Sequence, residues 1–402
     1  MYSFEELRVA IEAKAGAEGV TTRRIRLGMV GGGEGAFIGG VHRFALRMDD
    51  QFELVAGALA SSADKAQRSG RALGLADDRI YSDFIEMAQA EAARPDGIEA
   101  VSIVTPNHMH APVAEAFLNV GIHVICDKPL ATTSADARRL QALAAEKQLV
   151  FAVTYNYSGY PMVRQARQMV QEGLLGEIRV VQVEYSQDWL TEPIEGGGQK
   201  QADWRTDPSR AGAGGCIGDI GTHAYQLAHF ITGLDATELL AELSTFVAGR
   251  RLDDNAQVML RYANGARGTL WASQVAPGNE NNLRIRIYGA SGGLEWKQEF
   301  PNQLRWSPFG QPTQTIARGT GAAGAAATRV TRIPSGHPEG YLEAFGTLYS
   351  EIAQAIRARR AGADALDPAV QYPTVVDGVH GVVFVETVVQ SAAAGGTWVP
   401  VP

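Results

Sequence analysis

Short apolar segments alternate with longer amphipathic segments through the first part of the chain. Brief apolar runs between turn residues are typical of buried strands, and the amphipathic stretches between them predict helices. Strands that alternate with helices in this way predict a mostly parallel, doubly wound α/β sheet. The expected strands are Ile25–Val30, Phe52–Leu59, Ala100–Val104, His123–Cys126 and Leu149–Val153. The expected helices are Gly39–Met48, Asp64–Leu73, Asp83–Ala93, Ala111–Asn119 and Ser134–Lys147, the last with Ser134 as N-cap and Asp136 in its first turn.

The pattern changes after Tyr155. Following a helix at Pro161–Glu172, longer segments alternate between polar and apolar residues and are separated by hairpin-like turns, which indicates a largely antiparallel sheet. Residues 311–338, rich in Gly, Ala, Thr and Pro, predict a long loop before two final helices at Tyr341–Arg359 and Val375–Ala392. The expected strands of this sheet are Ile178–Tyr185, Glu238–Phe246, Asp254–Tyr262, Ala266–Ser273, Leu283–Tyr288 and Gly293–Lys297.

These patterns divide the chain into three parts. Residues 1–22 predict an amphipathic helical extension, residues 23–153 a dinucleotide-binding domain of Rossmann type, and residues 154–402 an α+β domain. The last helices of that domain could pack back on the first one. A chain of 402 residues with 45% hydrophobic content is long enough for two such cores.

Charge and cysteine content narrow the function classes. A net charge of −8 gives no general attraction for nucleic acid or an anionic membrane surface. Two cysteines, Cys126 and Cys216, do not make a disulfide framework. The sequence shows neither a signal-peptide pattern nor an uninterrupted apolar run of about 18 residues, so we predict a soluble cytoplasmic protein.

A glycine-rich turn (GGGEG, residues 31–35) joins the first strand to the first helix. In a β–α–β unit such a turn lets the backbone approach a pyrophosphate at a helix N-terminus. Gly31 and Gly33 begin the G-x-G-x-x-G pattern, whose third position is Ala36 or, after a longer loop, Gly39. The turn predicts dinucleotide contacts from Gly31, Gly33, Gly35, Ala36, Phe37 and Ile38.

The end of the second strand bears on the choice of cofactor. An acidic residue there would bind the ribose of NAD, and an arginine would favour NADP. The chain has Ser61 and Ser62 instead, with Lys65 and Arg68 farther along the next helix. We predict NAD as the cofactor, with NADP as the open alternative. Ser61 and Ser62 either contact the adenosine ribose or cap the following helix.

Two further strand ends carry polar residues where ligands of open α/β sheets bind. Thr105, Pro106 and Asn107 follow one strand, with His108 and His110 close behind. His108-x-His110 raises the alternative of a metal site, but no second ligand pair lies nearby, so no metal is predicted.

Asp127 and Lys128 follow the next strand. A lysine at this edge could stabilise a developing alkoxide, and Pro129 restricts its backbone to an extended conformation.

Residues 214–223 (GGCIGDIGTH) hold an aspartate and a histidine four positions apart. If the helix predicted after them includes both, Asp219 and His223 lie on one face. A histidine oriented by a carboxylate suits proton transfer near neutral pH. The alternative is a histidine that only packs.

Together these motifs resemble the glucose–fructose oxidoreductase, inositol dehydrogenase and rhizopine-catabolism (Gfo/Idh/MocA) family of NAD(P)-dependent oxidoreductases. The likeness runs from about Arg24 to the C-terminus. It rests on the glycine turn, Thr105-Pro106-Asn107 with His110, Lys128-Pro129, Tyr155-Asn156-Tyr157, Trp204-Arg205 and residues 215–223. The chain departs from the family in its longer glycine turn and in Asp127, where the family usually has glutamate.

The resemblance implies roles for particular residues. It implies catalysis by Lys128, Asp219 and His223, and cofactor contacts from the Thr105–His110 segment and Asp127-Lys128. It also implies a substrate pocket lined by Tyr157, Trp204 and Arg205. His337 follows the long loop, where it either closes over the substrate or caps the next helix.

The resemblance further implies a sugar or cyclic polyol substrate and a homo-oligomer formed through the second sheet. Three alternatives stay open. They are a redox-neutral sugar enzyme with tightly bound NAD, a non-catalytic dinucleotide sensor, and a zinc hydrolase that uses His108, His110 and His223.

Overall fold

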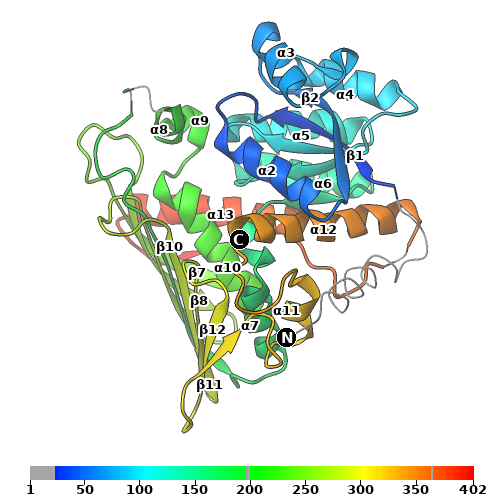
Figure 1. Ribbon diagram of the computed structural model, residues 1–402. Coiled ribbons are helices and arrows are strands. Elements are labelled where there is room, and N and C mark those ends of the chain that lie inside the picture. The colour runs from blue at the N-terminus through cyan, green and yellow to red at the C-terminus, as the bar shows by residue number, and fades with distance from the viewer. Residues whose placement is uncertain (1–22, 196, 198–199, 364) are drawn as a thin grey trace.

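The computed structural model describes residues 23–195, 197, 200–363 and 365–402. The predicted helical extension, residues 1–22, lies outside the described residues. The described chain forms two sheets that share no strand, with two long helices between them (Figure 1). The α/β architecture predicted from the sequence is confirmed.

The first sheet is parallel, with the strand order β2-β1-β3-β4-β5. Every residue of β3 and β4 is buried, as expected for strands covered on both faces. The order reverses between β1 and β3, and ligands of open α/β sheets bind at such a switch point. The strands are β1 Ile25–Gly31, β2 Phe52–Ala58, β3 Ala100–Val104, β4 His123–Cys126 and β5 Phe151–Val153.

The helices around this sheet lie close to their predicted positions, with one cap corrected. The N-cap of α6 is Thr133, because its extended backbone lets the side-chain oxygen accept a hydrogen bond from Asp136 N. Ser134, predicted as the cap, is already helical. The helices are α2 Phe37–Met48, α3 Ala63–Ala72, α4 Phe84–Ala93, α5 His110–Asn119 and α6 Ser134–Glu146, with short helices η1 Asp77–Arg79 and η2 Asn107–Met109.

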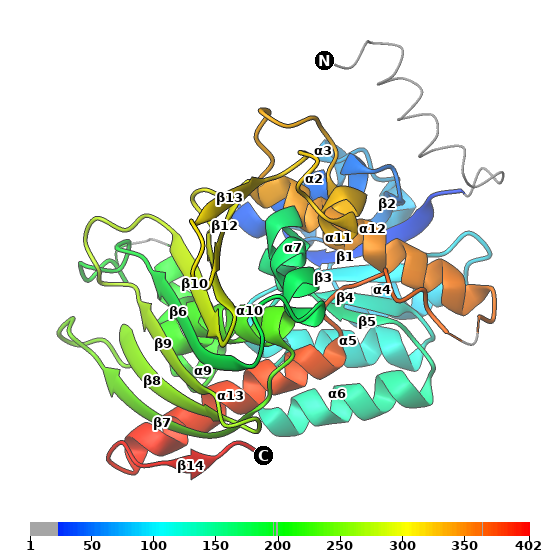
Figure 2. The ribbon, with the colours of Figure 1, turned by 90° about the horizontal axis from the view of Figure 1, so that it is seen from below.

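The second sheet has the order β13-β12-β11-β10-β6-β9-β8-β7-β14 and is antiparallel except where β6 meets β9. Helices α7 and α10 lie on one of its faces (Figure 2). The strands are β6 Ile178–Ser186, β7 Ala236–Ser244, β8 Asn255–Tyr262, β9 Arg267–Ser273, β10 Asn282–Gly289, β11 Gly292–Lys297, β12 Gln303–Pro308, β13 Gln314–Ala317 and β14 Val399–Pro400. The helices are η3 Asn156–Gly159, α7 Pro161–Gln171, α8 Lys200–Arg205, α9 Pro208–Ala211, the π-helix η4 Ile217–Gly221 and α10 Thr222–Thr232.

Two long helices connect the sheets. Helix α12 (Tyr341–Arg360) packs on α2 and η3, and α13 (Val375–Ala393) packs on α6, β7 and α10. The contact between α12 and η3 is tight, because a Cβ atom on Gly159 would lie 2.1 Å from the Ala344 carbonyl oxygen. Helix α13 is long and apolar enough to cross a membrane, but 56% of its apolar window is buried inside the molecule, as in a core helix.

The prediction of a loop over residues 311–338 is wrong. The segment contains β13 and α11 (Ala325–Val330), and β12 precedes it. Its small residues hide the strand and helix periods. Arg318, only 2% exposed, donates hydrogen bonds to the carbonyl oxygens of Ile333, Pro334 and His337 and to the Glu339 carboxylate. One buried guanidinium therefore holds the segment against the start of α12.

We expect Glu339→Ala to lower the free energy of unfolding by about 3–5 kcal/mol, because it leaves the Arg318 charge buried and unpaired. Urea titration followed by fluorescence measures the change. Arg71→Ala, which breaks the exposed pair Arg71–Asp77, serves as the control and should lower the free energy of unfolding far less, because water screens an exposed ion pair. Equal losses in the two variants would contradict the role given to Arg318.

Candidate active site

Three glycines make the turn after β1. Gly31 has a φ of +82°, which favours glycine, and a Cβ on Gly33 would lie 2.5 Å from the Leu59 carbonyl oxygen. A Cβ on Gly39 would lie 2.4 Å from Gly32 Cα, so Gly39 lets α2 pack against the turn. Gly39, not Ala36, is therefore the third glycine of the dinucleotide pattern, after a lengthened loop.

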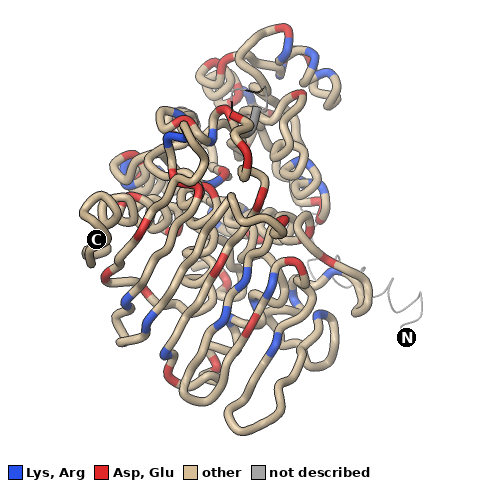
Figure 3. Tube along the Cα trace, turned by 90° about the vertical axis from the view of Figure 1, so that its left-hand side faces the viewer, with Lys and Arg blue, Asp and Glu red and all other residues tan. Residues whose placement is uncertain are grey.

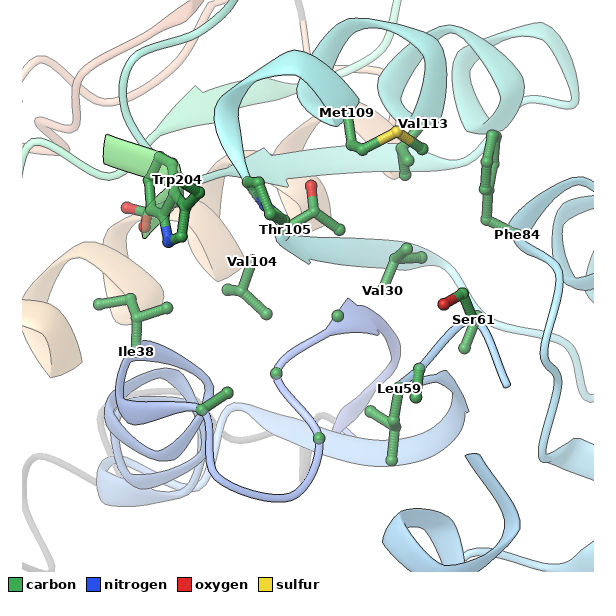
Figure 4. A pocket seen from close by; sticks show the side chains of 18 of the residues that line it. Val30, Ile38, Leu59, Ser61, Phe84, Val104, Thr105, Met109, Val113 and Trp204 are labelled. Atoms are coloured by element: carbon green, nitrogen blue, oxygen red, sulfur yellow. The ribbon is translucent and has the colours of Figure 1, made fainter. Parts of the chain in front are cut away.

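A cavity of about 520 Å³ lies along this turn and the carboxyl ends of the neighbouring strands (Figure 4). It collects most of the residues predicted from the sequence, including two from the second domain. The predicted residues that line it are Gly31, Gly33, Ala36, Phe37, Ile38, Ser61, Ser62, Thr105, Pro106, Asn107, Asp127, Lys128, Trp204 and Arg205.

The lining of the cavity fits a dinucleotide. In Figure 4, Phe84, Met109 and Val113 form an apolar group on the side where Ser61 lies, suited to an adenine ring and its ribose. The Thr105 hydroxyl oxygen is buried without a hydrogen-bond partner among the described residues, so a polar contact is available there. Lys65 also lines this part of the cavity, where the end of β2 carries no carboxylate.

Two predicted cofactor residues lie outside this cavity. Gly35 lines a neighbouring cavity with Arg43 and Arg68. His110 is 1% exposed, and its ring nitrogens face the carbonyl oxygens of Pro129 (2.6 Å) and Thr105 (2.9 Å). It therefore ties two strand-end loops together behind the cavity. Neither nitrogen is available to a metal, which argues against the zinc alternative.

The strand-end lysine reaches across to the second domain. Lys128 Nζ donates to the Asp219 carboxylate (Oδ1, 2.8 Å) and to the Asp219 carbonyl oxygen (2.7 Å). The other carboxylate oxygen, Oδ2, accepts from Gln274 Nε2 at 2.9 Å and lies 3.4 Å from Arg205 Nε. Burial opposes ionisation of Asp219, but Lys128 and Arg205 prevail and hold its pKa well below the usual range. Asp219 is therefore a fixed anion.

Asp219 and His223 belong to different kinds of helix, which corrects the simple i, i+4 prediction. Asp219 lies in the π-helix η4 and His223 in the first turn of α10. Single π-turns inside helices are rare and frequent at functional sites. The turn is held by Asp253, whose carboxylate accepts from Gly215 N (2.5 Å), Ile217 N (2.9 Å) and Cys216 Sγ.

His223 lies in an aromatic pocket, 5.0 Å between ring centroids from Tyr157, 5.6 Å from Tyr155 and 6.4 Å from Tyr185. Burial, and then the nearby Lys128 charge, lower the pKa of His223 well below its usual value. Its Nδ1 is buried without a partner among the described residues. The imidazole is therefore neutral near pH 7.

Sequence reasoning missed Gln187 and Gln274, which directly follow β6 and β9. These strands are the parallel pair of the second sheet, and Ser186 is in register with Ser273, so both side chains emerge at one edge. A signal was present in principle: a polar residue after each of two parallel strands. The antiparallel appearance of the surrounding sequence concealed it.

His337 does not line the cavity. It is exposed, and the N-cap of α12 is Gly340, so neither role considered for His337 is seen. Tyr341, the first residue of α12, lies closer to the site. Its pKa is raised by burial and by the nearby Tyr157, Asp127 and Asp219.

Comparison with known proteins matches both parts of the chain. Residues 25–155 match the oxidoreductase family with an NAD-binding Rossmann fold, and residues 163–295 match the GFO/IDH/MocA C-terminal domain.

Individual relatives cover nearly the whole chain. An oxidoreductase structure from Sinorhizobium meliloti is 54% identical, with a TM-score of 0.86, over 94% of this chain and 100% of that one. An inositol dehydrogenase homologue from Azotobacter vinelandii, solved with NADH and myo-inositol, is 38% identical, with a TM-score of 0.90, over 94% and 98%. Levoglucosan dehydrogenase of Pseudarthrobacter phenanthrenivorans is 28% identical over 94% of this chain and 99% of its own length.

The glycine turn, the cavity beside it and these matches agree: the chain is an NAD-binding oxidoreductase of the GFO/IDH/MocA family.

Proposed function

We propose that this protein is an NAD-dependent dehydrogenase that oxidises a secondary hydroxyl of a cyclic polyol or sugar to a ketone or lactone. The observation that carries the proposal is the pairing of Lys128 with an ionised Asp219 beside a neutral, buried His223, next to the dinucleotide cavity. This arrangement offers a cation, a fixed anion and a base within one site.

The three side chains take different roles in the proposed reaction. His223 accepts the hydroxyl proton as general base, since its lowered pKa keeps it unprotonated. Lys128 stabilises the negative charge that develops on the substrate oxygen. Asp219 holds the lysine in place and stays ionised throughout. Bound NAD supplies the hydride acceptor.

The residues that line the cavity support the following placement of the cofactor. The turn at Gly31 and Gly33 would hold the pyrophosphate, and Ser61 with Lys65 would hold the adenosine ribose. Thr105 and Lys128 would contact the nicotinamide end.

Cyclic polyols are proposed from two lines of support. One is the chemistry of the relatives, which include an inositol dehydrogenase homologue and levoglucosan dehydrogenase. The other is the hydrogen-bonded group of neutral side chains next to His223, in which Tyr157, Gln187 and Asn281 carry hydroxyl and amide groups that suit uncharged hydroxyls. The redox-neutral sugar enzyme remains the second candidate, because the same three groups could serve a transient oxidation.

A substrate panel tests the proposal. Purified protein is mixed with myo-inositol, levoglucosan, aldoses and glycosides, with NAD and NADP in parallel, and absorbance at the nicotinamide band is followed. We expect NADH formation with at least one cyclic polyol. Product formation without NADH would favour the redox-neutral class, and no reaction with any member would contradict the proposal.

We expect His223→Ala and Lys128→Ala each to reduce kcat by at least about 10²-fold, since each removes a group that assists proton transfer or stabilises the oxyanion. Steady-state kinetics and circular dichroism check activity and folding. His229→Ala is a matched control, because His229 lies near the other end of the same helix, where its Nδ1 faces the Leu234 carbonyl oxygen and the Asp235 carboxylate. Turnover near that of the wild type in either site variant would refute the role assigned to that residue.

The homo-oligomer predicted from the sequence is proposed to form through the open face of the second sheet. Acidic and basic residues are distributed along the strands of this sheet (Figure 3). Among them, Arg284 lies between Glu184 (3.5 Å) and Glu295 (2.8 Å). The side chains of Met259 and Tyr288 are exposed apolar groups on the same sheet.

The predicted cytoplasmic location and the domain boundary at residue 153 remain predictions.

We expect light scattering to give at least twice the monomer mass of 43.0 kDa. Met259→Arg and Tyr288→Arg together should shift the protein toward monomer, because they place added like charges on a face that self-associates. A wild-type mass of one chain would contradict the proposed interface.

A further inference from the structure

A buried glutamine lies directly behind the Asp219 carboxylate. Gln274 is 2% exposed, and its Nε2 donates to Asp219 Oδ2 at 2.9 Å and lies 3.3 Å from Gln187 Oε1. Its backbone is held on both sides, by a hydrogen bond to the Asp254 carbonyl oxygen and one from Leu190 N. With acceptors on two sides of Nε2, the orientation of the amide is set.

Gln274 is also the end of a chain of uncharged side chains. Gln187 Nε2 donates to Asn281 Oδ1 at 2.7 Å, and the Tyr185 hydroxyl donates to the same oxygen at 2.7 Å. The Tyr185 hydroxyl lies 2.5 Å from that of Tyr157, whose ring contacts His223. The chain therefore joins the surroundings of Asp219 to those of His223 without adding charge.

The hydrogen bond from Gln274 restrains the rotation of the Asp219 carboxylate. Rotation about its last side-chain bond is broad and soft. Lys128 holds Oδ1, while Oδ2 faces Arg205 at 3.4 Å as well as Gln274. Without the glutamine, the carboxylate can turn toward the guanidinium, and the ammonium group bound to it moves as well.

We propose that Gln274 is a positioning residue, which fixes the rotation of the Asp219 carboxylate and thereby the place of Lys128 Nζ at the reaction centre. This inference rests on the proposed dehydrogenase function. A displacement of about 1 Å at a reacting group can cost on the order of 10²-fold in rate.

The first test is Gln274→Leu, which keeps the volume and removes the donor. We expect kcat to fall about 10-fold or more, with the dissociation constant for NADH, measured by fluorescence titration, within about 2-fold of the wild type. Gln165→Leu is the matched control. Gln165 is a buried amide, 5% exposed, that accepts from Gly324 N and lies outside the site, so its loss should lower stability without changing kcat.

The second test is Gln274→Glu, read as a pH profile. In the wild type, kcat/KM should hold steady from pH 8 to about pH 6.5 and fall only below it, because His223 has a lowered pKa and must be unprotonated to act. In the variant, two carboxyl groups meet at Asp219 Oδ2, and like charges raise the pKa of one of them. The charged and titratable groups around this position include Lys128, Arg205, Asp127, Asp219, Asp253, Asp254, His223, Cys216, Tyr157, Tyr185 and Tyr341.

When the new carboxyl is protonated it can donate as the glutamine did. When it is ionised it repels Asp219. The activity of Gln274→Glu should therefore rise as pH is lowered through the range where the wild type is flat. A role limited to packing would not reverse the slope.

Two outcomes would overturn the inference: wild-type kcat in Gln274→Leu, or a Gln274→Glu profile parallel to that of the wild type. Should the leucine variant fail to fold, the glutamate variant, which is nearly the same size as glutamine, still decides. A wild-type protein that oxidises no polyol would instead contradict the proposed function itself.

Discussion

The ion pair between Lys128 and Asp219 is the contact on which the site depends. The lysine stands at the carboxyl end of β4 in the first sheet, and the aspartate lies on the π-turn of the second domain. Neither domain alone contains both groups. Burying two charges is costly unless they pair closely and their remaining donors and acceptors also form hydrogen bonds. Here Gln274, Arg205 and the Asp219 carbonyl oxygen complete the arrangement, so the pair exists only when the domains are docked.

The rest of the fold makes that docking rigid. Helix α12 begins beside the site at Tyr341 and packs on α2, the helix that follows the glycine turn. Helix α13 bridges α6 of the first domain and β7 of the second. Nearer the cavity, Asn107 donates to the Ala211 carbonyl oxygen at 2.9 Å, which ties the short helix α9 to the strand-end loop after β3. The segment carrying Trp204 and Arg205 is thereby held over the cofactor cavity.

Much of the first domain could be predicted from the sequence, because each of its elements has a local signature. The apolar run of β3, the glycine turn and the residues after each strand depend on neighbours in the chain, and parallel topology carries them to one edge. The second domain was less predictable where order comes from distant partners. Residues 311–338 have no periodic pattern, and their structure depends on Arg318 reaching Glu339. Gln187 and Gln274 meet only because β6 and β9 are parallel neighbours. No local sequence pattern predicts that these two strands pair.

One short segment around the π-turn holds an ionised carboxylate and a neutral imidazole. In a continuous α-helix, residues 219 and 223 would stack on one face and share surroundings. Here Asp219 lies in the π-turn η4, which Asp253 holds, and His223 lies in the first turn of α10. Asp219 meets two cations and is held ionised, while His223 enters a ring of tyrosines where burial keeps it neutral. Lys128 contributes to lowering both pKa values, so a carboxylate that stays ionised lies near an imidazole that stays unprotonated at the same pH. On that ground the carboxylate is the fixed anchor of the proposed reaction, and the imidazole, the group left free to exchange a proton, is its base.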